Sequence, residues 1–202
     1  MTNQQYDQPL VSIDVVPLRY NRKLKSLEYG VSPRLFEPFK DELALPGVLL
    51  RSGEGVNDAA QRALRSKAEL PTGELRQFGV FDGTNRDPRG ATISIAFLSL
   101  QHEAGDGVVW VSDAQRLPFD HSQIAAAAQA HAKLLMWKDE ALTQAVLEKS
   151  FTVADVLVFD SPTPHASNVG RWLDAHPSLR RSDNLSKTGS VGRPAVAWEW
   201  LS

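Results

Sequence analysis

The 202-residue chain contains no cysteine, which excludes disulfide bonds, thiolate metal ligands and cysteine nucleophiles. No apolar run approaches the ~20 residues of a membrane-spanning helix. The polar N-terminal stretch MTNQQYDQPL lacks the charged-then-apolar pattern of a signal peptide. The formal net charge is only -2, so the chain as a whole has no excess of positive charge for nucleic acid or an anionic membrane. We therefore expect a cytoplasmic protein with no membrane partner, in which DNA binding would need a local basic patch.

Apolar residues are plentiful enough for a substantial core. Hydrophobic residues make up 42% of the chain and charged residues 23%, which is ordinary for a globular protein. This length suits one large domain, or one medium and one small domain. Residues 1–9 predict a flexible tail, and a change in composition near Lys149 indicates a boundary between domains at 10–149 and 150–202.

The segment 44–70 (ALPGVLLRSGEGVNDAAQRALRSKAEL) predicts a strand, a glycine turn and a helix. Asn57 is the expected N-cap, and Asp58 lies in the first turn, where negative charge suits the helix dipole. The helix is expected to run to about Glu69, because Pro71 stops it. Its spacing predicts one apolar face, made of Ala59, Ala60, Ala63, Leu64 and Ala68.

Apolar and β-branched runs predict strands on both sides of that segment. They cover residues 11–18, 24–31, 75–81, 91–101 and 107–111. The stretch 122–149 is rich in alanine and contains neither proline nor glycine, so we expect one long helix or two helices in tandem.

The C-terminal part of the chain, 150–202, contains several short elements. A helical or mixed piece at 152–159, capped by Thr152, is followed by a helix at 165–175. A polar, glycine-bearing stretch at 180–192 then leads to a final alternating strand at 195–201. Helix, turn, helix and a basic hairpin ending in a strand is the order of a winged helix-turn-helix domain.

The helix at 165–175 is the predicted recognition helix of such a domain. The residues expected to contact DNA are polar or basic and lie on this helix or on the hairpin: His165, Ser167, Asn168, Arg171, Arg180, Arg181, Lys187 and Arg193. From Ser161 onward, five Lys or Arg residues face three Asp or Glu residues, a small excess that a dimer would double. The alternative is that these charges are the solvated surface of an accessory domain. The tryptophans at 172, 198 and 200 are expected in the core.

The segment 44–70 also resembles a Nudix box, in which glycine, glutamate, arginine and aliphatic residues recur at fixed spacing. The opening glycine falls on Val48, and the matching positions that are kept are Glu54, Arg62, Leu64 and Leu70. The three glutamates of the box helix fall on Ala63, Ser66 and Lys67, and its closing glycine falls on Glu69.

The loss of these acids changes the chemistry that the resemblance implies. Glutamates at i, i+3 and i+4 share a helix face, where they hold divalent cations against a pyrophosphate. This chain has a methyl, a hydroxyl and an ammonium group there, so no metal site, catalytic residue or cofactor is expected. Basic residues could instead neutralise a phosphate directly: Arg51, Arg62, Arg65 and Lys67.

Two further stretches extend the resemblance. Residues 78–100, with the turn DPRG at 87–90, and residues 116–128 are similar to the corresponding parts of ADP-ribose-type Nudix proteins. That group includes Nudix-type transcriptional regulators of NAD metabolism, and residues 150–157 and 192–195 resemble their C-terminal part. The resemblance implies an α/β fold, a Nudix-like α/β/α sandwich with a mixed sheet, followed by a small winged helix. It also implies a homodimer whose partners are DNA and an effector, ADP-ribose or a related nucleotide.

The candidate ligand site follows from this resemblance and from the positions of the basic residues. The expected ligand-binding residues are Arg34, Arg51, Glu54, Arg62, Arg65, Arg86 and Arg89. Arg62 has a second candidate role, in which it pairs with Glu54 as part of the scaffold. Phe36, Phe39 or Phe81 could stack an adenine, but each is expected in the core. His121 is expected to belong to a helix lead-in and not to act as a ligand.

The leading hypothesis is a ligand-responsive transcriptional regulator with a catalytically inactive Nudix domain. One alternative is a hydrolase of the ADP-ribose pyrophosphatase type, which would use acids outside the degenerate helix: Glu54, Glu69, Asp82 or Asp87. Another is a binding or protein-interaction module with neither activity. The sequence leaves open which effector binds and whether it promotes or relieves DNA binding.

Overall fold

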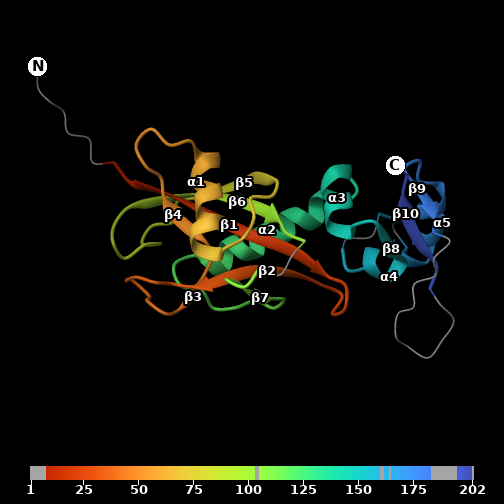
Figure 1. Cartoon of the computed structure of the whole chain (residues 1–202), viewed down its shortest axis with the longest axis horizontal. Helices are drawn as coiled ribbons and strands as arrows, with labels where there is room; N and C mark the ends of the chain where they lie inside the picture. The colour runs from red at the N-terminus through yellow and green to blue at the C-terminus, as the bar shows by residue number, and fades with distance from the viewer. Residues whose placement is uncertain (1–7, 103–104, 160–161, 164, 183–194, 202) are drawn as a thin grey trace, which may run out of the picture. The chain divides into compact units, whose positions relative to one another are not determined.

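The computed structural model describes residues 8–102, 105–159, 162–163, 165–182 and 195–201 (Figure 1). The chain divides into two compact units. The first, here called the sheet unit, comprises Met1–Arg19 and Glu28–Gln129, and the second, the C-terminal unit, comprises Tyr20–Leu27 and Ala130–Ser202. The domain boundary expected after Lys149 lies inside the C-terminal unit. In the described ranges, no helix is both long and apolar enough to span a bilayer.

A seven-stranded mixed sheet forms the centre of the sheet unit. Its strand order is β3-β2-β1-β6-β5, with β4 paired to β1 and β7 paired to β2. The central strands β1 and β6 run parallel, from Leu10 opposite Thr92 to Leu18 opposite Leu100. The strands are β1 Leu10–Asn21, β2 Ser26–Pro33, β3 Leu43–Ala44, β4 Gly47–Leu49, β5 Leu75–Phe81, β6 Thr92–Leu100 and β7 Val109–Val111.

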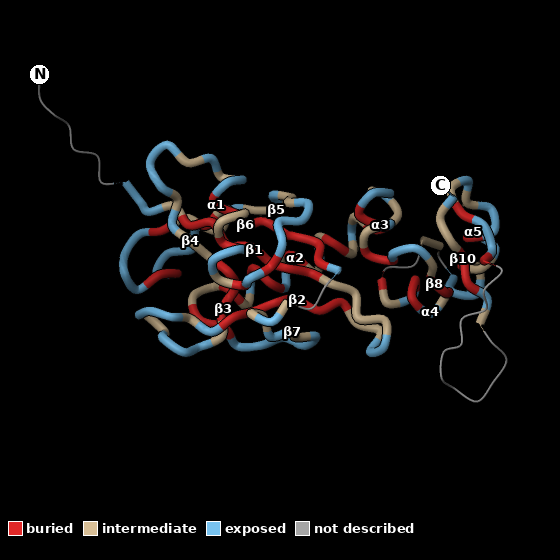
Figure 2. Tube along the Cα trace, viewed as in Figure 1, coloured by how far each residue is buried: buried red, intermediate tan, exposed pale blue. Residues whose placement is uncertain are grey.

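The central strand β1 is buried continuously from Ser12 to Leu18. A strand covered on both faces has no solvent side and does not alternate apolar with polar residues. Figure 2 shows this buried strand crossing the middle of the sheet unit. Asp14 is an ionisable side chain within this buried run, only 4% exposed. A buried carboxylate requires partners, and those partners form part of the candidate site.

The predicted helix is present as α1 Val56–Ala63, continued by a π-helical turn, η1 Leu64–Ala68. Its predicted apolar face is confirmed, because these side chains are buried against β1 and β6. The expected N-cap was wrong by two residues: Gly55 is the N-cap and Asn57 lies inside the helix, while Asp58 lies in the first turn as expected. Glu69 ends the helix in a left-handed conformation, with φ of 52°.

The alanine-rich stretch forms two helices in tandem, α2 His121–Leu135 and α3 Glu140–Leu147. The single long helix over 122–149 is therefore wrong. Trp137 adopts a φ of 68°, which interrupts the helix, and the side chain of Asp139 caps α3 by accepting a hydrogen bond from the Leu142 backbone N–H. In Figure 1, α1 lies in front of the sheet and α2 behind it, which gives the mixed α/β architecture that was predicted.

The C-terminal unit contains a three-stranded antiparallel sheet of order β8-β10-β9. Its further elements are β8 Ser150–Thr152, α4 Val153–Val156, the 3₁₀ turn η2 Ala166–Asn168, α5 Val169–Ala175, β9 Leu179–Arg181 and β10 Ala197–Trp200. Thr152 caps α4 as predicted, but α4 ends at Val156, short of the expected Phe159. Trp198 is buried as expected, and Trp172 and Trp200 are half-buried in a cluster around Trp137.

Asp155 explains why residues 20–27 belong to the C-terminal unit. This carboxylate is 1% exposed and accepts hydrogen bonds from the Thr152 hydroxyl and from the Tyr20 hydroxyl at 2.7 Å. The Lys25 ammonium group pairs with the same carboxylate. The Thr152 backbone N–H donates to it as well, so four donors around one buried charge hold the strand ends and the start of α4 together.

Candidate ligand pocket

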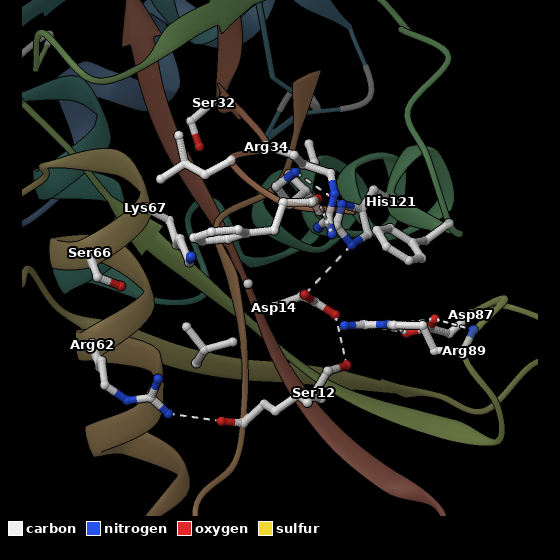
Figure 3. Close-up of a pocket in the computed structure, with 18 of the residues that line it drawn as sticks. Ser12, Asp14, Ser32, Arg34, Arg62, Ser66, Lys67, Asp87, Arg89 and His121 are labelled. Carbon is white, nitrogen blue, oxygen red and sulfur yellow. Dashed lines mark hydrogen bonds and ion pairs between the residues drawn. The ribbon is translucent and has the colours of Figure 1, made fainter. Parts of the chain in front are cut away.

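A cavity of about 590 Å³ opens in the sheet unit. Its walls come from β1, β2, β4, the helix α1–η1, the loops at 34–37 and 86–89, and the start of α2. The volume lies within the range of about 300–1,000 Å³ that is usual for small-molecule sites. Figure 3 shows polar and charged side chains converging on it from β1, β2, the helix α1–η1, the two loops and the start of α2, whereas β4 contributes only apolar residues and a glycine.

Asp14 anchors the floor of the pocket. Its Oδ2 accepts hydrogen bonds from the Ser94 hydroxyl at 2.5 Å and from the Ser12 hydroxyl at 3.2 Å. The Arg86 guanidinium approaches the same oxygen at 3.4 Å. Gly47 lies directly opposite on β4, where a Cβ atom would stand 2.2 Å from Asp14 Oδ1. The absence of a side chain at 47 therefore lets the strand backbone pass over this carboxylate.

Arg86 is buried and serves the scaffold of the pocket. Its guanidinium forms two hydrogen bonds to the Asp120 carboxylate, at 2.6 and 2.8 Å. Burial alone would lower the pKa of Arg86, but Asp120 and Asp14 outweigh it and raise the pKa further. This arginine is thus committed to two carboxylates, although one edge of it lines the cavity.

His121, the first residue of α2, forms part of the pocket wall, which the sequence analysis did not predict. The ring is 3% exposed, and its Nδ1 accepts a hydrogen bond from the Leu45 backbone N–H at 3.0 Å. Burial lowers the pKa of His121, so the ring is neutral at pH 7 and carries its proton on Nε2. Nε2 faces Asp14 Oδ1 at 3.6 Å (Figure 3). No local sequence signal separates such a wall residue from a helix lead-in.

The DPRG turn contributes an internal ion pair to the pocket. Arg89 donates to both oxygens of the Asp87 carboxylate, at 3.0 Å from Nε and 2.6 Å from Nη2. Burial by itself raises the pKa of Asp87, and the hydrogen bonds from Arg89 outweigh this and leave the pKa below its usual value. Arg34 donates to the Pro38 carbonyl at 2.7 Å and stacks over the Phe119 ring at 4.8 Å.

Arg62 and Glu54 form a bidentate ion pair with both hydrogen bonds at 2.7 Å. Arg62 also donates to the Leu49 carbonyl at 2.9 Å, which ties the helix to β4. The hydrogen bonds from Arg62 lower the pKa of Glu54 to about 2. This geometry is the scaffold role that the sequence offered as the second possibility for Arg62.

The structure brings most of the seven predicted ligand residues to one cavity. The members that line it are Arg34, Arg51, Arg62, Arg86 and Arg89. Glu54 lies behind Arg62, and Arg65 is exposed; neither is among the lining residues. Lys67, which was not among the seven, lines the cavity together with Ser66.

The helix face that carries metal ligands in the family does not fit a divalent cation here. Ala63 is fully buried and offers a methyl group, and Ser66 and Lys67 present a hydroxyl and an ammonium group to the cavity side. Hard divalent cations prefer carboxylate and carbonyl oxygens, and an ammonium group repels them. In the part of the chain that the structure describes, no group of three or more His, Asp or Glu side chains is placed to hold a metal ion.

Phe36 lies at the rim of the cavity and is 69% exposed, so its expected place in the core was wrong. It sits in the loop after β2, and its ring lies 5.7 Å from the Nζ of Lys67. Phe39 packs edge-on against Phe119 with ring centroids 4.9 Å apart, and Phe81 contacts Phe78 outside the cavity. Among the three phenylalanines considered for adenine stacking, Phe36 alone lines the pocket.

Those residues predicted to contact DNA that the structure describes lie on the surface of the C-terminal unit. Ser167, Arg171, Arg180 and Arg181 are exposed, as is His165, and Asn168 is half-buried. Two of the arginines are paired: Arg180 with Glu199 and Arg181 with Asp174, each at 2.7 Å. Lys187 and Arg193 lie outside the described residues. The pairing reduces the positive charge that this surface offers to a phosphate backbone.

No protein-family model matches the chain. A curated relative is the ADP-ribose pyrophosphatase of Methanocaldococcus jannaschii, which is 30% identical over 128 residues. The match covers 59% of this chain and 72% of that protein.

Two solved structures match over 95% or more of the chain, and a third matches over 65% of it. A MutT/nudix family protein from Enterococcus faecalis aligns with a TM-score of 0.72 and 21% identity, covering 100% of this chain and 90% of that one. NrtR from Shewanella oneidensis, solved in complex with a 27mer DNA, aligns with a TM-score of 0.70 and 19% identity, covering 95% and 93%. The Nudix domain of the same protein, solved in complex with ADP-ribose, aligns with a TM-score of 0.57 and 21% identity, covering 65% and 93%.

These likenesses agree with the mixed α/β fold of the sheet unit. The structural matches show the Nudix-like fold, and the relative that is 30% identical shows that the similarity extends to the sequence. The chain belongs to the Nudix family.

Proposed function

We propose that the chain is a ligand-responsive transcriptional regulator. In this proposal the Nudix pocket of the sheet unit senses ADP-ribose or a related nucleotide without hydrolysing it, and residues 150–202 form a winged helix-turn-helix domain that binds DNA. The NrtR structures, which hold DNA and ADP-ribose, support both halves of the proposal.

The observation that carries the sensor half is the chemistry of the helix beside the pocket. A cavity of about 590 Å³ lined by several cations suits a nucleotide. The face that would hold catalytic metal ions is occupied by Ala63, Ser66 and Lys67. A protein that binds its ligand but lacks this acid cluster preserves the ligand, as a sensor must.

The order of elements in the C-terminal unit supports the DNA-binding half. Helix α3, strand β8, helices α4 and α5 and the strands β9 and β10 follow one another as in a winged helix. In this arrangement α5 is the recognition helix, and Ser167 and Asn168 in the 3₁₀ turn before it, together with Arg171 in its first turn, would reach base edges. A homodimer would double the basic surface and would place two recognition helices on two half-sites.

Coupling between the two activities requires that the effector favour one arrangement of the dimer over another. A nucleotide in the pocket would then change the spacing of the two recognition helices and therefore the affinity for DNA. A coupling of 5- to 150-fold, about 1–3 kcal/mol, is typical for such effectors.

The test is an electrophoretic mobility shift with the full chain and the DNA upstream of its own operon, with and without ADP-ribose. We expect retardation at low salt that weakens steeply as the salt concentration rises, because phosphate contacts dominate affinity. Arg171→Ala should weaken the shift, whereas the exposed Lys40→Ala in the sheet unit should not. No retardation at low salt in either condition would refute the proposal.

A second candidate function is hydrolysis of ADP-ribose, favoured by the curated relative of that name. Of the acids offered for it in the sequence, Asp87 lines the cavity but is locked to Arg89, and Glu54 is locked to Arg62. The assay is magnesium-dependent release of AMP from ADP-ribose. Release that falls in Glu54→Gln or Asp87→Asn would establish the enzyme and would displace the sensor.

A further inference from the structure

We propose that Lys67 replaces the divalent cation of the family, so that this pocket binds a diphosphate group through an ammonium ion and without metal. The nucleotide class of the ligand rests on the proposed function, whereas the metal-free diphosphate site is argued from the residues that line the pocket and from their charges.

The side chain of Lys67 extends from the helix into the cavity (Figure 3). Its Nζ lies 5.7 Å from the centre of the Phe36 ring, which belongs to the loop on the other side of the pocket mouth. Ser66 and Arg62 line the same wall. A phosphate that entered between the helix and the opposite wall would therefore meet this ammonium group.

The backbone fixes the position of Lys67. It lies in the π-helical turn Leu64–Ala68, and π-helical turns inside α-helices occur frequently at functional sites. Leu64 and Ala68 are fully buried and Leu70 nearly so, which anchors the turn on the core on both sides of Lys67. Because its neighbours are held, Lys67 has to project from the turn toward the cavity side.

The balance of charge around the cavity leaves positive charge for a ligand. Three of the lining arginines are neutralised by carboxylates, since Arg62 pairs with Glu54, Arg89 with Asp87, and Arg86 with two aspartates. Within the described part of the chain, three other lining cations form no ion pair with a carboxylate, and these are Arg34, Arg51 and Lys67.

These three cations match the chemistry of a diphosphate. Arg34 donates to carbonyl oxygens and forms no ion pair with any carboxylate that the structure describes, although Asp87, Asp14 and Glu37 lie near enough to act on its charge. A diphosphate in a nucleotide sugar carries two negative charges, and an ammonium group binds phosphate as a compact point charge. In the family the same position on the helix delivers a metal ion to the diphosphate, so Lys67 supplies positive charge where the metal would.

The inference predicts binding that is independent of divalent cations. The experiment is calorimetric titration of the full chain with ADP-ribose and, separately, with inorganic pyrophosphate, each in EDTA and in magnesium. We expect equal affinity for ADP-ribose in the two buffers. Lys67→Met keeps the length of the side chain and removes its charge, and we expect it to weaken binding by about 10- to 100-fold, the usual effect of losing a charged hydrogen bond.

Arg65→Met is the matched control, because it removes one positive charge from the same turn at an exposed position outside the cavity lining. Its affinity should equal that of the unmodified chain. The unfolding midpoints of both variants are measured without ligand as a control for folding. Because both side chains reach solvent, we expect these midpoints to equal that of the unmodified chain.

The outcomes separate this inference from the proposed function. If ADP-ribose binding requires magnesium, or if Lys67→Met leaves the affinity unchanged, the role of Lys67 is overturned. The proposed function as a nucleotide sensor would still stand in that case. Pyrophosphate binding in EDTA that depends on Lys67, without any binding of ADP-ribose, would support the metal-free site and remove the proposed effector. No binding of either probe in EDTA would overturn the inference.

Discussion

The buried guanidinium group of Arg86 links two carboxylates at the pocket, those of Asp14 and Asp120. Arg86→Met retains an apolar stem of similar length but removes the guanidinium that two carboxylates share. The two hydrogen bonds to Asp120 are charge-assisted, and the side chain of Asp14 is only 5% exposed and would lose its cation. Breaking a buried ion pair by removing one partner costs about 3–5 kcal/mol.

The lower end of that range applies here. The Asp120 side chain is 16% exposed, so water can solvate part of its charge once the arginine is gone, whereas Asp14 keeps only its two serine donors. We expect a loss of about 3 kcal/mol in the free energy of unfolding, which corresponds to about 6–12 °C in Tm for a chain of 202 residues. Arg86→Lys should lose less, because it keeps the charge but not the bidentate geometry.

Urea unfolding followed by circular dichroism gives the free energy of unfolding, and hydrogen exchange shows which strands lose stability. Amide protection should fall in β1 and β6 and remain unchanged in β8 and β10, which belong to the C-terminal unit. Adding Asp120→Asn to Arg86→Met should cost less than the sum of the single changes, because the uncompensated charge is removed. A loss below about 1 kcal/mol, or equal loss of protection in both units, would refute this account of the network.

Three further predictions concern the same unit. Glu54→Gln should destabilise the chain at neutral pH, because it removes the ion pair with Arg62. The pKa of Glu54 is lowered to about 2, so the stabilisation from this pair is complete above the ordinary value of 4.5 and is lost as pH falls through 2. If the unfolding midpoints of the variant and the unmodified chain differ by the same amount at pH 7 and pH 2, this account is wrong. Gly47→Ala should cost about 2 kcal/mol or more, because its Cβ would overlap the carboxylate of Asp14, whereas Gly83→Ala, with open space around it, should be nearly neutral in the same denaturation assay. Phe36→Ala should leave the unfolding midpoint unchanged, because the ring is exposed, and should weaken ADP-ribose binding about tenfold, because a ring at the pocket rim can stack on a base. An unchanged affinity in calorimetry would exclude this stacking role.

Several features of the fold could be predicted because they depend on local pattern. The apolar face of α1 follows from residues spaced three and four apart, and the structure buries all of it. The long β1 strand follows from its β-branched run. The break between α2 and α3 at Trp137 could not be located from the sequence, because no proline or glycine lies there and the helix cap at Asp139 is only a weak signal.

The candidate site was predicted only in part, for a reason that concerns distance along the chain. The basic residues were recognised singly, but their partners are far away: Arg86 is bound to Asp14 and Asp120, 72 and 34 residues distant. The sequence does not show whether an arginine already forms an ion pair with a distant carboxylate or is available to bind a ligand. It therefore gave equal weight to Arg86 and Arg51, although the first is bound to two carboxylates.

The sequence by itself determined what the helix of segment 44–70 can bind, because ligand capacity depends on side-chain chemistry at known positions on a helix face. Alanine, serine and lysine cannot assemble a magnesium site wherever the helix lies. The tertiary structure alone decided which charges remain for a ligand, because ion pairing depends on the approach of β1, the DPRG turn and the start of α2. It also decided that Lys67 faces the cavity, because the buried neighbours of the π-helical turn leave it that direction.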